Sequence, residues 1–293
     1  MGVRLGLVGR GRWGRNIERT LLSFPNVSVS VIARGQRPLS GLDGVLIATQ
    51  SATHAQVSLP YIEAGIPTFI EKPMATNISD AEHIGVAAAR SGAVVFIGHI
   101  YLHHPAFLAA VALLPELGAI RYLHCEGMNQ SPRSDCSVLW DWLPHDLSMA
   151  RAIFGRKPDS VTARSLAGGS RPEAALSIFQ FGTASVVSTT SWFSPVARRQ
   201  TTIQCERATL LFDDKADQQL VLLDKASGER SYPAYSREPP LTRELAAFIQ
   251  AVRSGKPDAS QIESGADIVR AIAAAETSIS LGGQEVTLDG SAG

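Results

Sequence analysis

Hydrophobic and polar residues follow two different patterns along this chain, and the change comes near residue 119. Before it, short apolar runs alternate with stretches of helical period. The strand-like runs cover residues 3–8, 27–33, 44–49, 67–70 and 93–98, and the helical stretches cover 15–23, 54–64 and 79–91. Strands that alternate with helices at this pitch predict parallel pairing through right-handed crossovers.

After residue 119 the apolar runs follow one another with few helices between them. They cover residues 119–128, 160–166, 174–181, 184–193, 200–206, 209–213 and 219–223. A helical stretch at 141–154 interrupts them, and helices at 241–252 and 263–281 follow. Consecutive short strands predict a mostly antiparallel open sheet. We therefore predict a Rossmann-type α/β domain over 1–118, an α+β domain over 119–240 and C-terminal helices over 241–293.

A glycine-rich turn follows the first strand. Gly9, Gly11 and Gly14 have the G-x-G-x-x-G spacing. The first glycine permits a tight turn, the second lets a pyrophosphate approach the backbone, and the third lets the helix pack on the strand. The helix that starts here presents unpaired N–H groups to phosphates. A glycine turn without a ligand is the alternative, but its place directly after a strand favours dinucleotide binding.

The end of the second strand bears on the choice of cofactor. NAD-binding folds usually carry an acidic residue there, which holds the ribose hydroxyls. This chain has Ala33 and Arg34, with no acid before Asp43. A guanidinium can hold a 2′-phosphate bidentately, so we predict NADP or NAD with NADP favoured. Arg34 as a solvated loop residue is the alternative. The 34–43 connection is also too short for the helix and strand of a full Rossmann half.

Polar residues follow the other predicted parallel strands. Thr49, Glu71, Lys72 and His99 all stand at such strand ends. Ligands of parallel sheets bind at the carboxyl ends of the strands, so these residues are expected to line one crevice. The predicted cofactor contacts are Gly9, Arg10, Gly11, Arg12, Trp13, Gly14, Ala33, Arg34, Thr49, His54, Glu71 and Lys72.

Composition narrows the class of protein. Lys plus Arg and Asp plus Glu number 27 each, so no net charge attracts the chain to nucleic acid or to an anionic membrane. No apolar run reaches 18 residues, and the first strand begins too early for a signal peptide. The three cysteines show no C-x-x-C spacing and suit a reducing compartment. We expect a soluble cytoplasmic protein.

Four segments in this order resemble the Gfo/Idh/MocA family of oxidoreductases. They are the glycine turn, the loop from Thr49 to His54, Glu71-Lys72-Pro73, and Asp141-Trp-Leu-Pro-His145. The resemblance implies an NAD(P)-dependent dehydrogenase or reductase. It also implies that the tail helices pack on the nucleotide domain, and that the open sheet supports a homodimer or homotetramer.

Asp141 and His145 are the candidate catalytic pair. Four residues apart on a helix, they share one face, and a carboxylate beside an imidazole fixes its tautomer and raises its basicity. Capping or a core hydrogen bond is the alternative for such a histidine. Lys72 would hold the substrate hydroxyl and favour loss of its proton. The resemblance gives these three residues the same roles. Asp146 is a candidate to support the catalytic residues without contacting the substrate itself.

The predicted substrate is carbohydrate-like, because the candidate pocket lining is polar and aromatic. The lining residues are Lys72, His99, Tyr101, His103, Arg133, Trp140, Asp141 and His145. Arg133 is the candidate contact for a diphosphate, and Arg133 and Trp140 as surface residues are the alternative. No metal is expected, since His99 and His103 lack a third ligand at short spacing. A catalytically silent nucleotide-binding regulator is the competing function.

Overall fold

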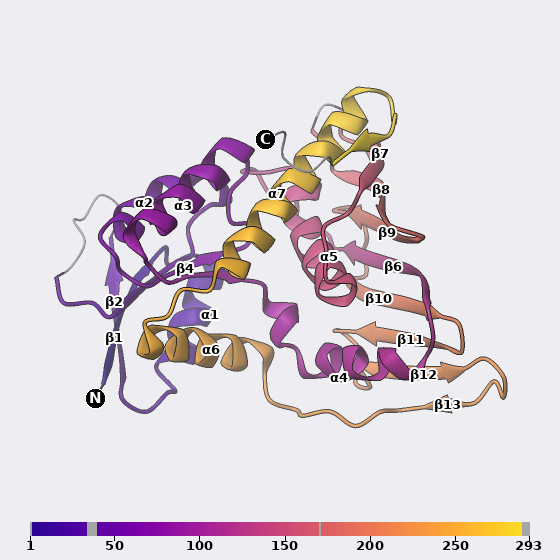
Figure 1. The fold of residues 1–293 in the computed structure, drawn as a ribbon, viewed down its shortest axis with the longest axis horizontal. Coiled ribbons are helices and arrows are strands. Elements are labelled where there is room, and N and C mark those ends of the chain that lie inside the picture. The colour runs from indigo at the N-terminus through magenta and orange to yellow at the C-terminus, as the bar shows by residue number, and fades with distance from the viewer. Residues whose placement is uncertain (1, 34–39, 170, 289–293) are drawn as a thin grey trace. The chain divides into compact units, whose positions relative to one another are not determined.

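The computed structural model describes residues 2–33, 40–169 and 171–288 (Figure 1). The chain divides into two compact units, Met1–Ile100 with Glu238–Val269 and Tyr101–Arg237 with Arg270–Gly293. Each unit contains one sheet. The predicted combination of a parallel sheet and a later, mostly antiparallel sheet is confirmed.

The first unit has a five-stranded sheet in the order β2-β1-β3-β4-β5, and each neighbouring pair is parallel. The strands are β1 (Val3–Val8), β2 (Val27–Ile32), β3 (Gly44–Ile47), β4 (Thr68–Glu71) and β5 (Val95–Gly98). The last three are buried along their whole length. This explains their short, continuous apolar runs, because helices cover both faces of such a sheet.

The helices of this unit come from both ends of the chain. They are α1 (Arg12–Leu21), α2 (His54–Glu63), α3 (Ile78–Ser91) and α6 (Pro240–Ser254). The long helix α7 (Ala259–Ser280) begins in this unit and ends in the other. Between β2 and β3 the described residues form no helix, as the short connection predicts.

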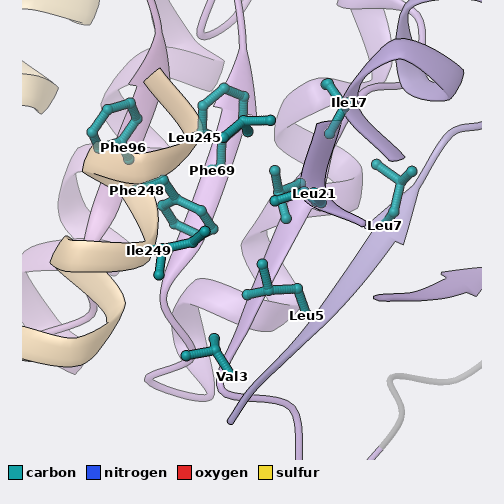
Figure 2. Packing of buried hydrophobic residues seen from close by; sticks show 11 residues of the cluster. Val3, Leu5, Leu7, Ile17, Leu21, Phe69, Phe96, Leu245, Phe248 and Ile249 are labelled. Atoms are coloured by element: carbon teal, nitrogen blue, oxygen red, sulfur yellow. The ribbon is translucent and has the colours of Figure 1, made fainter. Parts of the chain in front are cut away.

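Figure 2 shows the core that α6 completes. Phe248 of α6 packs edge-on against Phe69 of β4 and Phe96 of β5, with ring centroids 5.5 and 5.9 Å apart. Leu5 and Leu7 of β1 join the same cluster and are fully buried. Aromatic pairs in this geometry contribute more than their buried area alone. The core of the first unit therefore depends on residues far apart in the sequence.

The second unit has a nine-stranded sheet in the order β13-β12-β11-β10-β6-β9-β8-β7-β14. The strands are β6 (Ile120–Met128), β7 (Ser160–Ala167), β8 (Ala174–Phe181), β9 (Ala184–Ser191), β10 (Arg198–Cys205), β11 (Ala208–Asp213), β12 (Leu220–Asp224), β13 (Arg230–Ser231) and β14 (Val286–Thr287). All neighbours are antiparallel except β6 and β9. The parallel pair is possible because a helix crosses over between β6 and the strands after it.

Two helices cover one face of this sheet, α4 (Pro105–Leu113) and α5 (Val138–Phe154). The strands alternate buried and half-exposed side chains, so the other face remains partly open. Gly127 of β6 allows the close approach of α5, because a Cβ there would lie 2.7 Å from the ring of Trp142.

The sequence did not predict α4. It did predict α5, which begins three residues earlier than expected, directly after Ser137.

Short one-turn helices η1 (Ser51–Thr53), η2 (Ile100–His103) and η3 (Leu114–Glu116) complete the secondary structure. Within the described ranges, no helix combines the length and the apolar character needed to cross a lipid bilayer.

Candidate active site

The glycine turn joins β1 to α1, and its three glycines differ in how much space surrounds them. Gly9 has a φ of +98°, and a Cβ there would lie 2.4 Å from the carbonyl oxygen of Ala48. A Cβ on Gly14 would lie 2.0 Å from the carbonyl oxygen of Gly9. On Gly11 it would meet no described atom within 4 Å. Gly9 and Gly14 therefore allow close packing, whereas Gly11 leaves open space beside the start of α1.

Trp13 and Glu71 connect this turn to the end of β4. The indole Nε1–H of Trp13 donates to Oε1 of Glu71 over 2.5 Å, and the backbone N–H of Lys72 donates to Oε2 over 3.2 Å. Glu244 of α6 is fully buried nearby, and burial together with the charge of Glu71 raises its pKa well above the usual value. The glycine turn and the Glu71-Lys72-Pro73 segment thus share one hydrogen-bonded carboxylate.

His54 holds two loops together at the strand ends. Its Nδ1 lies 2.7 Å from the carbonyl oxygen of Pro73, and its Nε2 lies 3.3 Å from that of Thr49. The side chain is buried. His54 therefore fixes the loop after β3 to the loop after β4, and its contact with a cofactor stays a prediction.

The remaining predicted residues of the first unit also stand at strand ends. Ala33 follows β2, Lys72 follows β4 and buried His99 follows β5. Arg10, in the glycine turn, forms an ion pair with Glu18 of α1 over 2.8 Å. Arg12 is the first residue of that helix. Arg34, on which the NADP prediction depends, lies outside the described residues.

In the second unit, α5 carries both Asp141 and His145, as the sequence predicts. Asp141 lies in the first turn of the helix, and its carboxylate accepts two hydrogen bonds. Trp192 Nε1 donates to Oδ2 over 3.0 Å, and Arg133 Nη1 donates to Oδ1 over 3.4 Å. His145 is half-buried one turn further along. The helical spacing puts the carboxylate and the imidazole on the same face.

Tyr101 packs against His145 and is itself held by charged side chains. The two rings meet edge to face, with centroids 5.0 Å apart. The phenol O–H of Tyr101 points to Oδ2 of Asp214 at 3.5 Å, while His104 Nε2 lies 3.4 Å from Oδ1. Burial acts to raise the pKa of Asp214, but His104, Lys215 and Arg199 together lower it to about 2. Asp214 is therefore a permanent anion that anchors the tyrosine.

A pocket beside His145 is lined in part by Tyr101, Glu126, Trp142 and Arg199. The guanidinium of Arg199 stacks over the Trp142 ring at 5.4 Å from its centroid. Of the predicted substrate residues of this unit, only Tyr101 and His145 line this pocket. Trp140 is buried and donates its indole N–H to Glu276 over 2.9 Å, and His103 is half-buried in η2.

Comparison with known proteins identifies the family. Residues 23–99 match the sequence model of the Gfo/Idh/MocA oxidoreductase family with its NAD-binding Rossmann fold, and residues 115–211 match that of its C-terminal domain. The two matches together take in more than half of the chain. The protein belongs to the Gfo/Idh/MocA family.

Several members of the Gfo/Idh/MocA family resemble this chain over part of its length. A UDP-N-acetylglucosamine 3-dehydrogenase from Acidithiobacillus ferrooxidans is 34% identical over 55% of this chain and 57% of its own. A myo-inositol dehydrogenase from Streptomyces leeuwenhoekii is 29% identical over 48% of this chain and 46% of its own. The chain thus matches about half the length of these curated relatives.

Structural similarity extends over nearly the whole chain. The crystal structure of an inositol dehydrogenase homologue from Azotobacter vinelandii, complexed with NADH and myo-inositol, superposes with a TM-score of 0.79. It covers 98% of each chain at 19% identity. At that identity the likeness establishes the shared fold of the Gfo/Idh/MocA family.

The glycine turn fits the dinucleotide that the family binds. Gly11 is the N-cap of α1 and has no side chain to satisfy the first backbone N–H groups of the helix. Its open surroundings leave room for a phosphate to approach those groups. The residues present therefore suit the pyrophosphate of a nicotinamide dinucleotide.

The sequence did not single out three residues around the pair on α5. They are Trp192, Arg199 and Asp214. Trp192 contacts Asp141 across 51 residues of chain, and Asp214 contacts Tyr101 across 113. The spacing of neighbouring residues in the sequence cannot predict contacts between segments that are so far apart in the chain.

Proposed function

We propose that this protein transfers hydride between a nicotinamide cofactor and a ring secondary alcohol or ketone of a sugar, nucleotide-sugar or cyclitol. The observation that carries the proposal is Asp141, held by two donors, one turn before His145 on α5. A carboxylate fixed beside an imidazole is what a general base needs. Membership of an NAD-binding oxidoreductase family supports the same activity.

Three residues have separate roles in the proposed reaction. The imidazole of His145 takes the proton of the substrate hydroxyl, and the carboxylate of Asp141 orients the ring and stabilises its positive charge. The ammonium of Lys72 steadies the substrate oxygen as negative charge develops on it. When bound, the nicotinamide supplies the carbon that accepts or gives the hydride.

The substrate class rests on the candidate lining and on the relatives. The side chains beside His145 include Tyr101 and Arg199, an aromatic and a charged group that suit contact with a hydroxylated ring. Proteins that act on inositol and on UDP-N-acetylglucosamine are among the relatives. We therefore favour a free or nucleotide-linked pyranose or a cyclitol. A diphosphate contact by Arg133 and contacts by His99, His103 and Trp140 stay predictions.

The choice between NADP and NAD rests on Ala33 and Arg34, with NADP favoured. Replacing Arg34 by Ala should weaken NADP(H) binding while leaving NAD(H) binding nearly unchanged, because only the former carries the 2′-phosphate. Calorimetry with both cofactors measures this difference. Equal loss for the two would refute the preference.

We also propose a homodimer or homotetramer formed through the half-exposed face of the nine-stranded sheet. That face alternates with the buried one along β8, β9 and β11. Light scattering of the purified protein, compared with a variant carrying Tyr122→Glu on the exposed part of β6, tests it. A monomer before substitution would contradict the proposal.

Absorbance of reduced nicotinamide in the presence of free sugars, nucleotide-sugars and cyclitols tests the activity. We expect turnover with at least one of them, and loss of that turnover in His145→Ala. The second candidate is a silent dinucleotide-binding regulator. Binding of NAD(P)(H) without turnover of any carbohydrate would favour it.

A further inference from the structure

The carboxylate of Asp141 is held from two different segments of the chain. Trp192, directly after β9, reaches Oδ2, and Arg133, in the loop before α5, reaches Oδ1. Each oxygen therefore has its own donor. A carboxylate held at both oxygens by groups from different segments cannot rotate without breaking one of the bonds.

Trp192 is fixed independently of Asp141. Its side chain is only 2% exposed, and its backbone N–H donates to the carbonyl oxygen of Glu173 over 2.9 Å. An indole N–H is a donor only, and a buried donor without an acceptor is costly. Asp141 supplies the acceptor, so the strand-end position of Trp192 determines where the carboxylate lies.

Arg133 is fixed by its own set of contacts. Its Nε and Nη2 form a bidentate pair with Asp135 at 3.0 and 2.8 Å, which leaves Nη1 directed at Asp141. Arg171 secures the same loop by donating to the carbonyl oxygens of Arg133 and Cys136. The hydrogen bond with Asp135 and the charges nearby raise the pKa of Arg133, so its charge is permanent.

We propose that Trp192 is a positioning residue for the reaction, acting with Arg133 through Asp141 on the imidazole of His145. This inference rests on the proposed function. The two donors fix the position of the carboxylate one helical turn before His145, where its negative charge favours the protonated imidazole. Trp192 does not touch the substrate in this scheme, so its effect depends entirely on Asp141.

A double-mutant cycle between Trp192→Phe and Asp141→Ala tests the inference. Phenylalanine keeps most of the ring packing and removes the N–H. Because a hydrogen bond to a charged group is worth roughly a ten- to hundredfold effect, we expect kcat to fall by about that factor while KM and cofactor affinity change little. In the Asp141→Ala background, which has no acceptor for the indole N–H, the same substitution should cause no further loss.

Trp140→Phe is the control for stability. It also removes an indole N–H that donates to a carboxylate, here that of Glu276, so it shows how much stability such a loss costs. Similar melting temperatures for the two tryptophan variants would show that Trp192→Phe folds. Arg133→Gln is the second variant, and its loss of kcat should also vanish in the Asp141→Ala background.

The outcomes are distinct. Unchanged kcat in Trp192→Phe, or an equal loss in both backgrounds, would overturn the inference while the unaltered protein still turns over its substrate. Absence of turnover by the unaltered protein on every carbohydrate tested would overturn the proposed function and this inference with it.

Discussion

The indole N–H of Trp13 lies 2.5 Å from Oε1 of Glu71, so the glycine turn after β1 is tied to the segment after β4. Trp13 is 39% exposed, so part of its ring faces solvent while its indole N–H makes the hydrogen bond. That hydrogen bond helps to keep the turn and the strand end in one arrangement.

We expect Trp13→Phe to weaken nicotinamide dinucleotide binding by roughly tenfold, because it removes a hydrogen bond to a charged group. Calorimetry with NAD(H) and NADP(H) measures the change. A Trp13→Phe variant that binds both dinucleotides as tightly as the unaltered protein would contradict the explanation.

The glycine turn offers a second pair of variants. Gly14→Ala places a Cβ 2.0 Å from the backbone oxygen of Gly9, and relieving that clash should cost about 1–3 kcal/mol of stability. Gly11→Ala meets no described atom, so it should fold normally and lose affinity for the dinucleotide. Thermal unfolding and cofactor titration of both proteins measure the contrast. Normal cofactor affinity in Gly11→Ala would argue against a phosphate at that position.

The catalytic assignment predicts that His145→Ala and Lys72→Ala each lower turnover with little change in cofactor affinity. Loss of a general base typically costs on the order of 100- to 10,000-fold. Steady-state kinetics and calorimetry separate the two effects. Tyr101→Phe is a milder comparison, because it keeps the ring that packs on His145 and loses the contacts of the phenol oxygen with Asp214 and Arg199. Full activity in either alanine variant would refute its role.

Asp146 makes stability depend on pH. Burial raises the pKa of Asp146 to about 7, although the hydroxyl of Ser188 donates to its carboxylate and acts to lower it. Between the ordinary value of 3.8 and about 7, the folded protein holds a proton that the unfolded chain has released. The contribution of Asp146 to stability therefore falls as pH rises through this window and stays low above it.

Asp146→Asn should remove that decline, because the amide carries no titratable proton. Urea unfolding at several pH values between 4 and 8 measures the difference from the unaltered protein. Asp217→Asn, at an exposed position of the same unit, is the control. A difference between the Asp146 variant and the unaltered protein that stays constant with pH would rule out the buried proton.

Sequence reasoning found those parts of the fold that depend on local pattern. The strands β1 and β3 were predicted because their apolar runs are short and are followed by turn residues. The pair of Asp141 and His145 was predicted because helical spacing alone brings residues four apart to one face. Helix α4 was missed because residues 105–113 are apolar almost throughout and have no polar face, so they show no helical period.

The environment of the candidate site was less predictable. Trp192 contacts Asp141 only because β9 runs beside β8 and ends near the start of α5. The anchoring of Tyr101 depends in the same way on the turn after β11, which carries Asp214. Such contacts follow from sheet order, and sheet order cannot be read from the spacing of residues along a single sequence.

Phe248 packs against Phe69 and Phe96 in the core, yet it is translated long after them, once strands β6 to β13 of the second unit have been made. During synthesis from the N-terminus, the first unit therefore remains incomplete, with these two rings lacking their cover until α6 leaves the ribosome. A nascent or truncated chain ending before α6 would expose this apolar surface and be a natural client for chaperones and proteases.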